Sequence, residues 1–354
     1  MLKDLEQTTY LPILSVRPGE MRALEELPTR TKERIFPFIP LRPWVGAHRL
    51  ESALNRIEEA FPNLPLIVGV GDREPPKDRP VFAELDELRR PSGGFRNWVS
   101  LIRRHENYVP VAQLFSGDIV EEDAQLASLF GLGRGLVLHV PRSAFGGLGS
   151  LAQRVAQITP QGSDTIFVLD YETVRADHLQ VGMLSTGYIN TIRQHCPAAT
   201  CAISATSFPS GFDGLIHQEI YERRLFNIIG EQSENLIYSD RGSARLDQPG
   251  GGGGQPYPRI DYPLATDWRF FRSDEQNGFL GYQEQAEALA ESQYWNPDLR
   301  VWGTQMIERT IAGDRSAISD PRKATAARIN LHLQVQSFYD DPQGAEETEE
   351  DWVD

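Results

Sequence analysis

Two carboxylates close together in the chain are the first candidates for chemistry. Asp170 and Glu172 lie two residues apart in the segment VLDYET. Side chains two residues apart in a β-strand point to the same face, so this spacing favours a pair of neighbouring carboxylates. Such a pair could act as general acid and base, or hold Mg²⁺ in a metal-dependent phosphoesterase. In the alternative interpretation, one of the two caps the helix that follows.

A second group of polar residues lies just past predicted strands and is rich in arginine. Guanidinium groups offer planar sets of donors that match phosphate and carboxylate, and aromatic faces stack on bases or sugars. The group therefore predicts a binding site for a small anionic ligand such as a nucleotide. In the alternative interpretation, these arginines and acids pair with one another and bind nothing. The candidate ligand-binding residues are Arg17, Arg42, Trp44, Asp72, Gln113, Arg142, Ser204 (with Thr206 beside it), Asp240 and Arg241.

Motifs for several well-known chemistries are incomplete. The glycine-rich segment Phe145–Ser150 lacks the spacing of a dinucleotide or P-loop motif, so we expect a loop cap there. The seven histidines show no H-x-x-x-H or H-E-x-x-H pairing, which argues against a zinc site. The only cysteines, Cys196 and Cys201, suggest neither a metal site nor a disulfide framework and favour a reducing compartment. No cofactor is evident, and Mg²⁺ enters only if the protein is an enzyme.

Positioning these residues requires a regular scaffold, and the hydrophobic pattern predicts one. Eight short, nearly continuous apolar runs alternate with amphipathic stretches, which is typical of parallel strands covered on both faces. We therefore predict a (β/α)₈ TIM-barrel-like α/β fold, with a doubly wound open sheet as the alternative. The predicted strands are Leu11–Val16, Ile35–Leu41, Leu66–Gly71, Tyr108–Leu114, Gly135–Pro141, Thr165–Tyr171, Thr200–Phe208 and Leu236–Asp240. The predicted helices between them are Gly19–Arg34, His48–Phe61, Gly93–Arg104, Glu121–Phe130, Leu148–Ile158 and Ala176–His195.

The rhythm of strands and helices breaks after the eighth run. We expect the barrel to occupy residues 1–248 and a glycine-rich loop, with five glycines at Gly250–Gly254, to occupy residues 249–258. Residues 259–340 should form a strand pair, Arg259–Tyr262 and Trp268–Arg272, and helices that complete or cover the barrel. We expect residues 341–354 to be a disordered acidic tail.

The charge is unevenly spread along the chain. The formal net charge is −15, and eight acids with no Lys or Arg lie between Asp340 and Asp354, so the rest of the chain carries −7. Broad binding to nucleic acid is therefore unlikely, because phosphates would be repelled over most of the surface, yet a local basic mouth is compatible with this balance. The N-terminal residues lack the apolar core of a signal peptide, and no run is long enough to span a membrane. We expect a cytoplasmic protein.

The chain opens with YLPILSVRPGEMRAL at Tyr10–Leu24 and continues with KERIFPFIPL at Lys32–Leu41. With these segments and the later ones given below, the sequence resembles the phage and bacterial "beta protein" family over nearly the whole chain, from Tyr10 to about Val335. Members begin with a Y-x-P-I-L strand, a basic residue, G-E and A-L, and this chain reads YLPILSVRPGEMRAL at Tyr10–Leu24. Where the family usually has a lysine in the first strand, this chain has Ser15 and Val16 before Arg17. Later landmarks in matching order are KERIFPFIPL, VLDYE, IYERRLFNII, YSDRGS, PRIDYP, WRFFR and RINLHL.

The resemblance implies a barrel-like fold and an origin in phages, prophages or bacterial mobile-element and defence loci, without an established activity. Landmark residues that carry over by match are Arg17, Glu20, Asp170, Asp240, Arg241, Arg259, Tyr262, Trp268 and Arg272. Arg259 joins the candidate ligand-binding residues on this ground. Taken together, the chain is expected to be a non-catalytic binding, sensor or interaction subunit with an anionic ligand or a partner protein from the same locus. The alternatives are a metal-dependent phosphoesterase or nucleotide-processing enzyme, and a structural scaffold.

Overall fold

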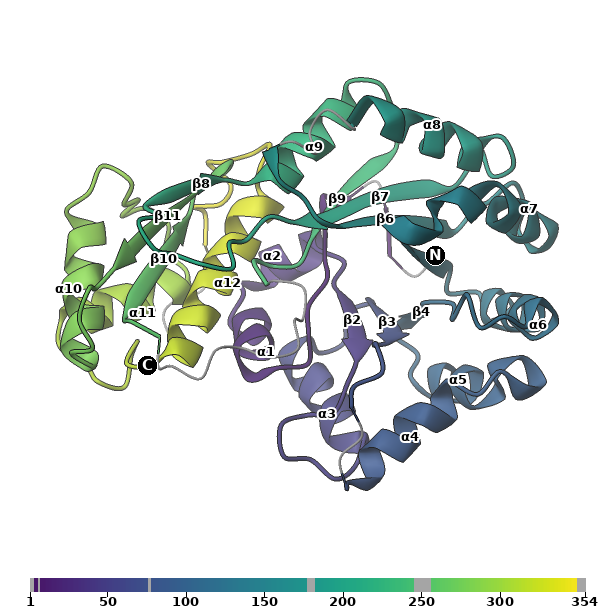
Figure 1. Cartoon of the computed structure of the whole chain (residues 1–354), viewed down its shortest axis with the longest axis horizontal. Helices are drawn as coiled ribbons and strands as arrows, with labels where there is room; N and C mark the ends of the chain where they lie inside the picture. Colours follow the sequence, from purple (N-terminus) through teal and green to yellow (C-terminus); the bar gives the residue numbers. More distant parts are fainter. Residues whose placement is uncertain (1–2, 6, 76–77, 177–181, 245–255, 349–354) are drawn as a thin grey trace.

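A computed structural model describes residues 3–5, 7–75, 78–176, 182–244 and 256–348. The fold is a mixed α/β arrangement with two parallel sheets (Figure 1). One has the order β1-β9-β7-β6-β5 and the other the order β2-β3-β4. Each of these eight strands overlaps a predicted one. Their bounds are β1 Tyr10–Pro12, β2 Phe38–Leu41, β3 Leu66–Val70, β4 Tyr108–Pro110, β5 Leu136–Pro141, β6 Thr165–Thr173, β7 Thr200–Thr206 and β9 Leu236–Asp240.

Backbone contacts link the two parallel sheets at both of their borders. Beside β1 and β2, a parallel bridge joins Ile13 to Phe38, and the Leu14 amide donates to the Phe38 carbonyl at 2.9 Å. Beside β4 and β5, a parallel bridge joins Val111 to Val137, and the Ala112 amide donates to the Val137 carbonyl at 2.9 Å. The two sheets are therefore hydrogen-bonded to one another at each end.

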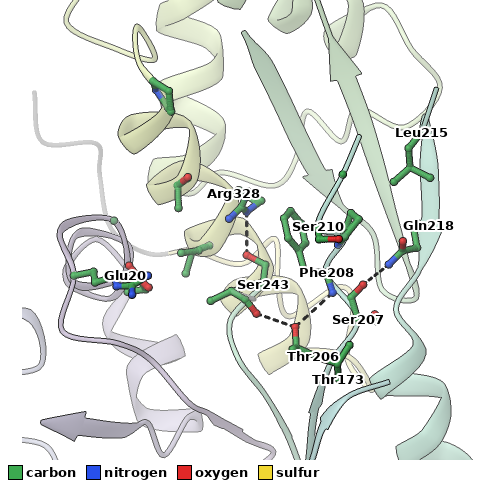
Figure 2. A pocket seen from close by; sticks show the side chains of 18 of the residues that line it. Glu20, Thr173, Thr206, Ser207, Phe208, Ser210, Leu215, Gln218, Ser243 and Arg328 are labelled. Carbon is green, nitrogen blue, oxygen red and sulfur yellow. Dashed lines mark hydrogen bonds between the residues drawn. The ribbon is translucent and has the colours of Figure 1, made fainter. Parts of the chain in front are cut away.

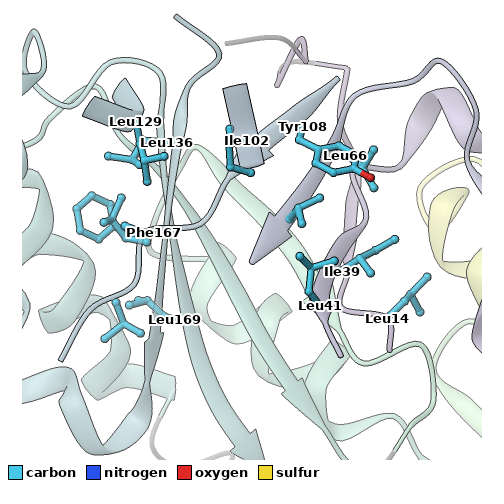
Figure 3. Close-up of a cluster of buried hydrophobic side chains, with 14 of the residues drawn as sticks. Leu14, Ile39, Leu41, Leu66, Ile102, Tyr108, Leu129, Leu136, Phe167 and Leu169 are labelled. Atoms are coloured by element: carbon cyan, nitrogen blue, oxygen red, sulfur yellow. The ribbon is translucent and has the colours of Figure 1, made fainter. Parts of the chain in front are cut away.

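The apolar runs are explained by burial on both faces of the strands. Along β6, Ile166 and Val168 belong to one cluster of buried side chains, whereas Phe167 and Leu169 belong to another. The first cluster takes residues from the regions of all eight parallel strands and fills the space between them. The second lies between the strands and the helices, and Figure 3 shows part of it. This division follows from the alternation of side chains along a strand.

Helices surround the parallel strands and bury their apolar stripes against them. In α3, for example, Ala53, Ile57 and Ala60 are fully buried at a spacing of three or four residues. The helices that follow parallel strands are α1 Pro18–Glu25, α2 Thr29–Arg34, α3 Glu51–Ala60, α4 Pro80–Leu88, α5 Ser92–Arg104, α6 Ile119–Phe130, α7 Leu148–Ile158, α8 Gly182–Arg193 and α9 Tyr221–Gly230, with a 3₁₀ turn, η1, at Arg142–Gly147.

Three local features differ from the predictions. The stretch predicted as one helix from Gly19 is two helices, α1 and α2, because Pro28 precedes the second in an extended conformation. The helix α4 was not predicted, because its apolar stripe is short and follows a long polar segment that is typical of a loop. The short strand β8, His217–Glu219, was also missed, because its exposed polar residues carry no apolar alternation.

The C-terminal part of the chain forms a separate antiparallel sheet with its own core. The predicted strand pair is present as β10 Arg259–Pro263 and β11 Asp267–Arg272, and β8 pairs with the other edge of β11. Three helices complete this part: α10 Phe279–Ala290, α11 Trp302–Ile311 and α12 Pro321–Ser337. Figure 1 shows α12, in yellow, between this group and the parallel strands. The five glycines at Gly250–Gly254 lie outside the described residues.

The segment expected to be a disordered tail starts with an ordered stretch. Ala345 is buried in the C-terminal core, and its carbonyl accepts from Gln334 Nε2 at 2.9 Å. Glu347 pairs with Arg30 at 3.0 Å, and Thr348 Oγ1 donates to the Arg300 carbonyl at 2.9 Å. The prediction of disorder is therefore wrong for residues 341–348, because it rested on composition and overlooked the apolar anchor. Residues 349–354 lie outside the described residues.

The helix α12 is buried from Ala326 to Ser337, apart from the half-buried Val335, although polar and apolar residues alternate from Arg328 to Gln336. Asn330 donates to the Ala23 carbonyl at 3.0 Å and accepts from the Gly303 amide at 2.9 Å. Gln334 accepts from Thr31, and Gln336 accepts from Arg223. Buried polar groups are costly unless they are paired, so these contacts fix how α12 sits against α1, α2, α9 and α11. Among the helices that the structure describes, none is long and apolar enough to cross a bilayer.

Candidate functional site

The principal cavity lies where several parallel strands end. It has a volume of about 1270 Å³ and is bordered by residues at or beyond the carboxyl ends of β1, β6, β7 and β9. Arg17, Thr173, Thr206 and Ser243 represent these four strand ends. The first turn of α1 and the first half of α12 form the opposite wall (Figure 2). The carboxyl ends of parallel strands are where α/β proteins commonly bind ligands, because loops and helix starts converge there.

The side chains that line this cavity carry an excess of positive charge. Four of them are arginines, Arg17, Arg175, Arg322 and Arg328, and among the described lining residues Glu20 is the only acid. The chain as a whole has a net charge of −15, so this balance runs against the average of the molecule. A cavity with this composition favours anions over cations.

Arg328 is held rigidly at the inner wall. Its Nη1 lies 2.9 Å from Asp261 Oδ2, and its Nε donates to Ser243 Oγ at 3.1 Å. The guanidinium also lies 4.1 Å from the ring centre of Phe208. Only 9% of the side chain is exposed. These contacts from three elements fix the orientation of the guanidinium before any ligand arrives, which lowers the entropy lost on binding.

Two other arginines are at the rim and have no such contacts. Arg175, just past β6, and Arg322, in the first turn of α12, are both exposed. Within the described parts of the chain neither forms an ion pair. Their charge is therefore available to a ligand, at the cost of ordering two long side chains.

Glu20 is a buried carboxylate in the same wall, with 5% of its surface exposed. Burial raises the pKa of Glu20 above its ordinary value, although a backbone hydrogen bond and the charges of Arg17, Arg328 and Arg42 partly offset this effect. A raised pKa makes a carboxyl group beside a cavity keep its proton to a higher pH than an ordinary one, which favours a role as proton donor. Glu20 is thus the residue of this cavity best suited to acid–base chemistry.

The loop after β7 forms one side of the cavity and is held in place by hydrogen bonds. Thr206 Oγ1 donates to the Ala244 carbonyl at 2.8 Å, and the Phe208 amide donates to Thr206 Oγ1 at 3.4 Å. Ser207 Oγ donates to Glu222. The Ser207 carbonyl accepts from Gln218, as Figure 2 shows. Glu222 is 3% exposed, and burial together with the nearby charge of Asp240 raises its pKa to about 7. These contacts hold the loop that forms one side of the cavity.

Behind the cavity, Asp240 is the centre of a fully buried cluster. Its Oδ2 lies 2.8 Å from the Tyr238 hydroxyl and 2.7 Å from His332 Nε2. Its Oδ1 accepts from the Gly242 amide at 2.7 Å and from the Tyr10 hydroxyl. Burial alone would raise the pKa of Asp240, but His332 and these donors outweigh it and hold the pKa below its ordinary value. The cluster joins β1, β9 and α12, and Asp240 does not line the cavity.

Asp170 and Glu172 do not form an exposed pair. Asp170 is 1% exposed and contacts His139 Nε2 at 2.9 Å and Arg241. Burial would raise the pKa of Asp170, yet His139 and Arg241 hold it below the ordinary value. Glu172 is exposed and has a positive φ of 63°, and the register of β6 against β7 shifts between Asp170 and Thr173. This irregularity interrupts the alternation on which the predicted pairing rested.

Three of the other predicted residues bond to partners within the protein. Arg42 Nε donates to Glu74 Oε1 at 2.9 Å, Gln113 Nε2 donates to the Leu88 carbonyl at 2.8 Å, and Arg259 pairs with Asp261. Ser204 is fully buried, and its hydroxyl has no hydrogen-bond partner among the described residues. Of the ten candidate ligand-binding residues named from the sequence, Arg17 alone lines the principal cavity. Trp44 is half-buried, and Asp72 and Arg142 are exposed elsewhere.

Several cavity residues were missed because they come from α12. Arg322, Thr325 and Arg328 recur every three residues, so they share one face of the helix and point into the cavity. That spacing in the sequence was the signal, but it lies far from the strand ends on which the prediction concentrated. Thr206, which was named beside Ser204, does line the cavity.

No group of three or more His, Cys, Asp or Glu side chains that could hold a metal ion occurs in the part of the chain that the structure describes. Asp170, Glu172 and Asp240 therefore do not assemble a metal site with one another. Asp170 instead contacts His139 and Arg241, Asp240 contacts His332, and Glu172 is exposed.

Comparison with known proteins places this chain in a family. The family model described as Beta protein matches residues 10–338, from the first residue of β1 to the residue after α12. The chain is also similar to "Protein beta" of Enterobacteria phage P4, with 29% identity over 341 residues that cover 94% of this chain and 93% of the phage protein. The match spans the parallel strands, the antiparallel sheet and α12 together, and the chain therefore belongs to the Beta protein family.

Proposed function

We propose that this protein binds a small anionic, phosphate-bearing ligand in the principal cavity and acts as a non-catalytic sensor or interaction subunit. The observation that carries the proposal is the balance of four arginines to one buried, high-pKa glutamate in the cavity lining. Arginine is suited to this task because its planar donors bind phosphate oxygens in pairs. The fixed guanidinium of Arg328 would orient the ligand, and the exposed Arg175 would attract it.

Membership of a family with a phage relative supports a biological setting for such a subunit. The related protein comes from Enterobacteria phage P4. We infer that the chain serves a phage, a mobile element or a defence system directed against phages, with the ligand reporting the state of the host cell. Binding assays in extracts of infected and uninfected host cells would test this setting directly.

We also propose that the eight parallel strands close into a (β/α)₈ barrel whose mouth is this cavity. The bridges at Ile13–Phe38 and Val111–Val137 support closure, as does the buried cluster to which all eight strand regions contribute. In a closed barrel the amides of Leu14 and Ala112 would exchange with solvent as slowly as amides inside the sheets. Fast exchange at both, compared with Ile203 in β7, would favour an open sheet instead.

A thermal-shift screen tests the binding proposal. The probes are inorganic phosphate, pyrophosphate, ribose 5-phosphate and ADP, each with and without Mg²⁺. A ligand at about 100 times its Kd should stabilise the protein by about 2.7 kcal/mol. We expect a shift that is reduced in Arg175→Ala and kept in Arg104→Ala, a control that removes the same charge from the exposed end of α5. Equal shifts in both variants would argue against the cavity as the site.

The surroundings of Glu20 support a second candidate function, an acid–base step on a bound phosphate ester. Its burial, raised pKa and neighbouring Arg17 and Arg328 provide one proton donor and two groups to stabilise negative charge. Turnover of a phosphodiester substrate that disappears in Glu20→Gln, with ligand binding retained, would favour this function. Turnover that needs Mg²⁺ and falls in Asp170→Asn would favour the metal-dependent enzyme.

A further inference from the structure

A second cavity adjoins the principal one. It has a volume of about 330 Å³ and lies between α1, α11 and α12. Pro18, Gly19 and Arg322 line both cavities, so the two share a wall at the first turns of α1 and α12. Its volume is at the lower end of the range of small-molecule sites, which is enough for part of a ligand that extends into the larger cavity.

The charge of the second cavity is more one-sided than that of the first. Arg22, Arg309, Arg322 and Lys323 line it, and no Asp or Glu is found among the described residues of its lining. Two of these cations are compensated from outside: Arg22 pairs with Glu25 and Glu26, and Arg309 pairs with Asp314. The remaining two, Arg322 and Lys323, are the ones whose charge a ligand would meet.

The side chains of Arg322 and Lys323 form no ion pair with a carboxylate in the described parts of the chain, although Asp320 Oδ1 accepts from both of their backbone amides. Lys323 Nζ donates only to neutral oxygens, the Ser316 carbonyl at 2.8 Å and Ser319 Oγ at 3.0 Å. Arg322 is exposed and forms no ion pair there. Both follow the N-cap Asp320 in the first turn of α12, where the helix dipole disfavours positive charge. Because neither side chain forms an ion pair within the described residues, an anion bound here would meet two positive charges.

One wall of the second cavity is aromatic and apolar. Trp302, the first residue of α11, is half-buried in the lining, next to Met306. The Arg22 guanidinium lies 5.7 Å from the centre of the indole ring. A planar indole beside two uncompensated cations suits a ligand that combines a flat ring with phosphate groups.

We propose that the two cavities form one elongated site for a nucleotide, with the heterocycle against Trp302 and the phosphates at Arg322 and Lys323. The phosphate chain would continue through the shared wall toward Arg175 and Arg328. This inference rests on the proposed anion-binding function and adds the class of ligand and a second set of binding residues. Lys323 and Trp302 line only the second cavity, and Arg175 lines only the first, so each half can be altered separately.

The test is isothermal titration of the full chain with ADP and, separately, with pyrophosphate. Loss of one stacked base typically costs about tenfold or more in affinity. Trp302→Ala should therefore weaken ADP binding by about tenfold and leave pyrophosphate binding unchanged. Lys323→Ala should weaken the binding of both probes. Trp302→Phe, which keeps an aromatic ring, and Lys323→Arg, which keeps the charge, should restore most of the affinity.

The outcomes separate this inference from the proposed function. Unchanged ADP affinity in Trp302→Phe, Trp302→Ala and Lys323→Ala, with binding lost in Arg175→Ala, would overturn the elongated site and leave the principal cavity intact. Equal weakening of ADP and pyrophosphate by Trp302→Ala would also overturn it, because a stacking residue must discriminate between the two. Absence of binding of either probe to the wild-type chain would overturn both proposals. Circular dichroism of each variant before titration identifies any that have lost their fold.

Discussion

The buried polar cluster around Asp240 and the adjoining cavity both contain charged side chains, but these differ in whether they have partners within the protein. In the cluster every carboxylate oxygen is matched: Tyr10 and Gly242 donate to one oxygen of Asp240, while Tyr238 and His332 contact the other. In the cavity, Arg175 and Arg322 have no ion-pair partner within the described chain, and arginines outnumber acids. Matched polar groups specify how elements pack, whereas unmatched ones at a cavity are left for a ligand.

The largest effect is expected from removing the centre of the matched cluster. Asp240→Ala leaves His332 and two tyrosine hydroxyls buried without their acceptor, and loss of one member of a buried charged pair costs about 3–5 kcal/mol. Urea denaturation should show this loss in the free energy of unfolding. Asp72→Ala, which removes an exposed acid from another strand end, should change it by less than about 0.5 kcal/mol. Similar small losses in both variants would show that the cluster does not stabilise the packing of α12.

The next effect concerns pH and distinguishes Glu222 from the acids of the matched pairs. Burial raises the pKa of Glu222 to about 7 from 4.5, so between these values the folded protein binds a proton that the unfolded chain lacks. Its contribution to stability is therefore present below about pH 4.5 and is lost as the pH rises through about 7. The whole change amounts to roughly 3 kcal/mol. Asp170 and Asp240, whose pKa values are lowered, act in the opposite direction and lose stability only in acid.

Glu222→Gln tests that assignment, because the amide keeps an acceptor for Ser207 and cannot titrate. The difference in unfolding free energy between the variant and the wild type should grow in favour of the variant between pH 5 and pH 8. Melting curves across this range give the difference directly. A constant difference would mean that Glu222 is not the group that titrates there.

These comparisons also explain which parts of the molecule could be predicted. All eight parallel strands were predictable because each is buried on both faces, which leaves a continuous apolar run such as Thr165–Tyr171 in the sequence. The strand β8 and the division between α1 and α2 were not predictable. A strand of three polar residues has no hydrophobic alternation, and a single proline does not by itself show that a helix ends. Residues 341–348 are ordered by the burial of Gly344 and Ala345 and by contacts of Glu347 and Thr348 with Arg30 and Arg300, none of which composition reveals.

The candidate site was predictable only in part. Reading past the strand ends found Arg17 and Thr206, which line the cavity, but it also selected Arg42, Asp240 and Arg241, which pair internally. The sequence does not show whether an arginine has an ion-pair partner when that partner is far away along the chain. Arg241 and Asp170 are such a pair. The opposite wall comes from α12, which no local pattern connects to the strands.

The smallest effect on stability and ligand affinity is expected for Arg42, one of the arginines that the sequence analysis selected. Arg42 pairs with Glu74, and both side chains are partly exposed, so Arg42→Ala should lower stability by about 1 kcal/mol or less. Arg42 does not line the principal cavity, so the Kd for pyrophosphate should stay within about twofold of the wild-type value. A lost contact to the ligand worth about 1.4 kcal/mol would change it by about tenfold. Loss of pyrophosphate binding in this variant would extend the site toward β2 and weaken the contrast between matched and unmatched groups.

The central claim is that unmatched arginines in the principal cavity bind a phosphate-bearing ligand, and titration calorimetry with pyrophosphate at low and high salt tests it most directly. We expect binding that weakens as salt increases and that is about tenfold weaker in Arg175→Ala, in line with the loss of one charge-assisted contact. Arg104→Ala should match the wild type. Absence of binding in the wild type, or equal affinity in Arg175→Ala and Arg104→Ala, would contradict the account.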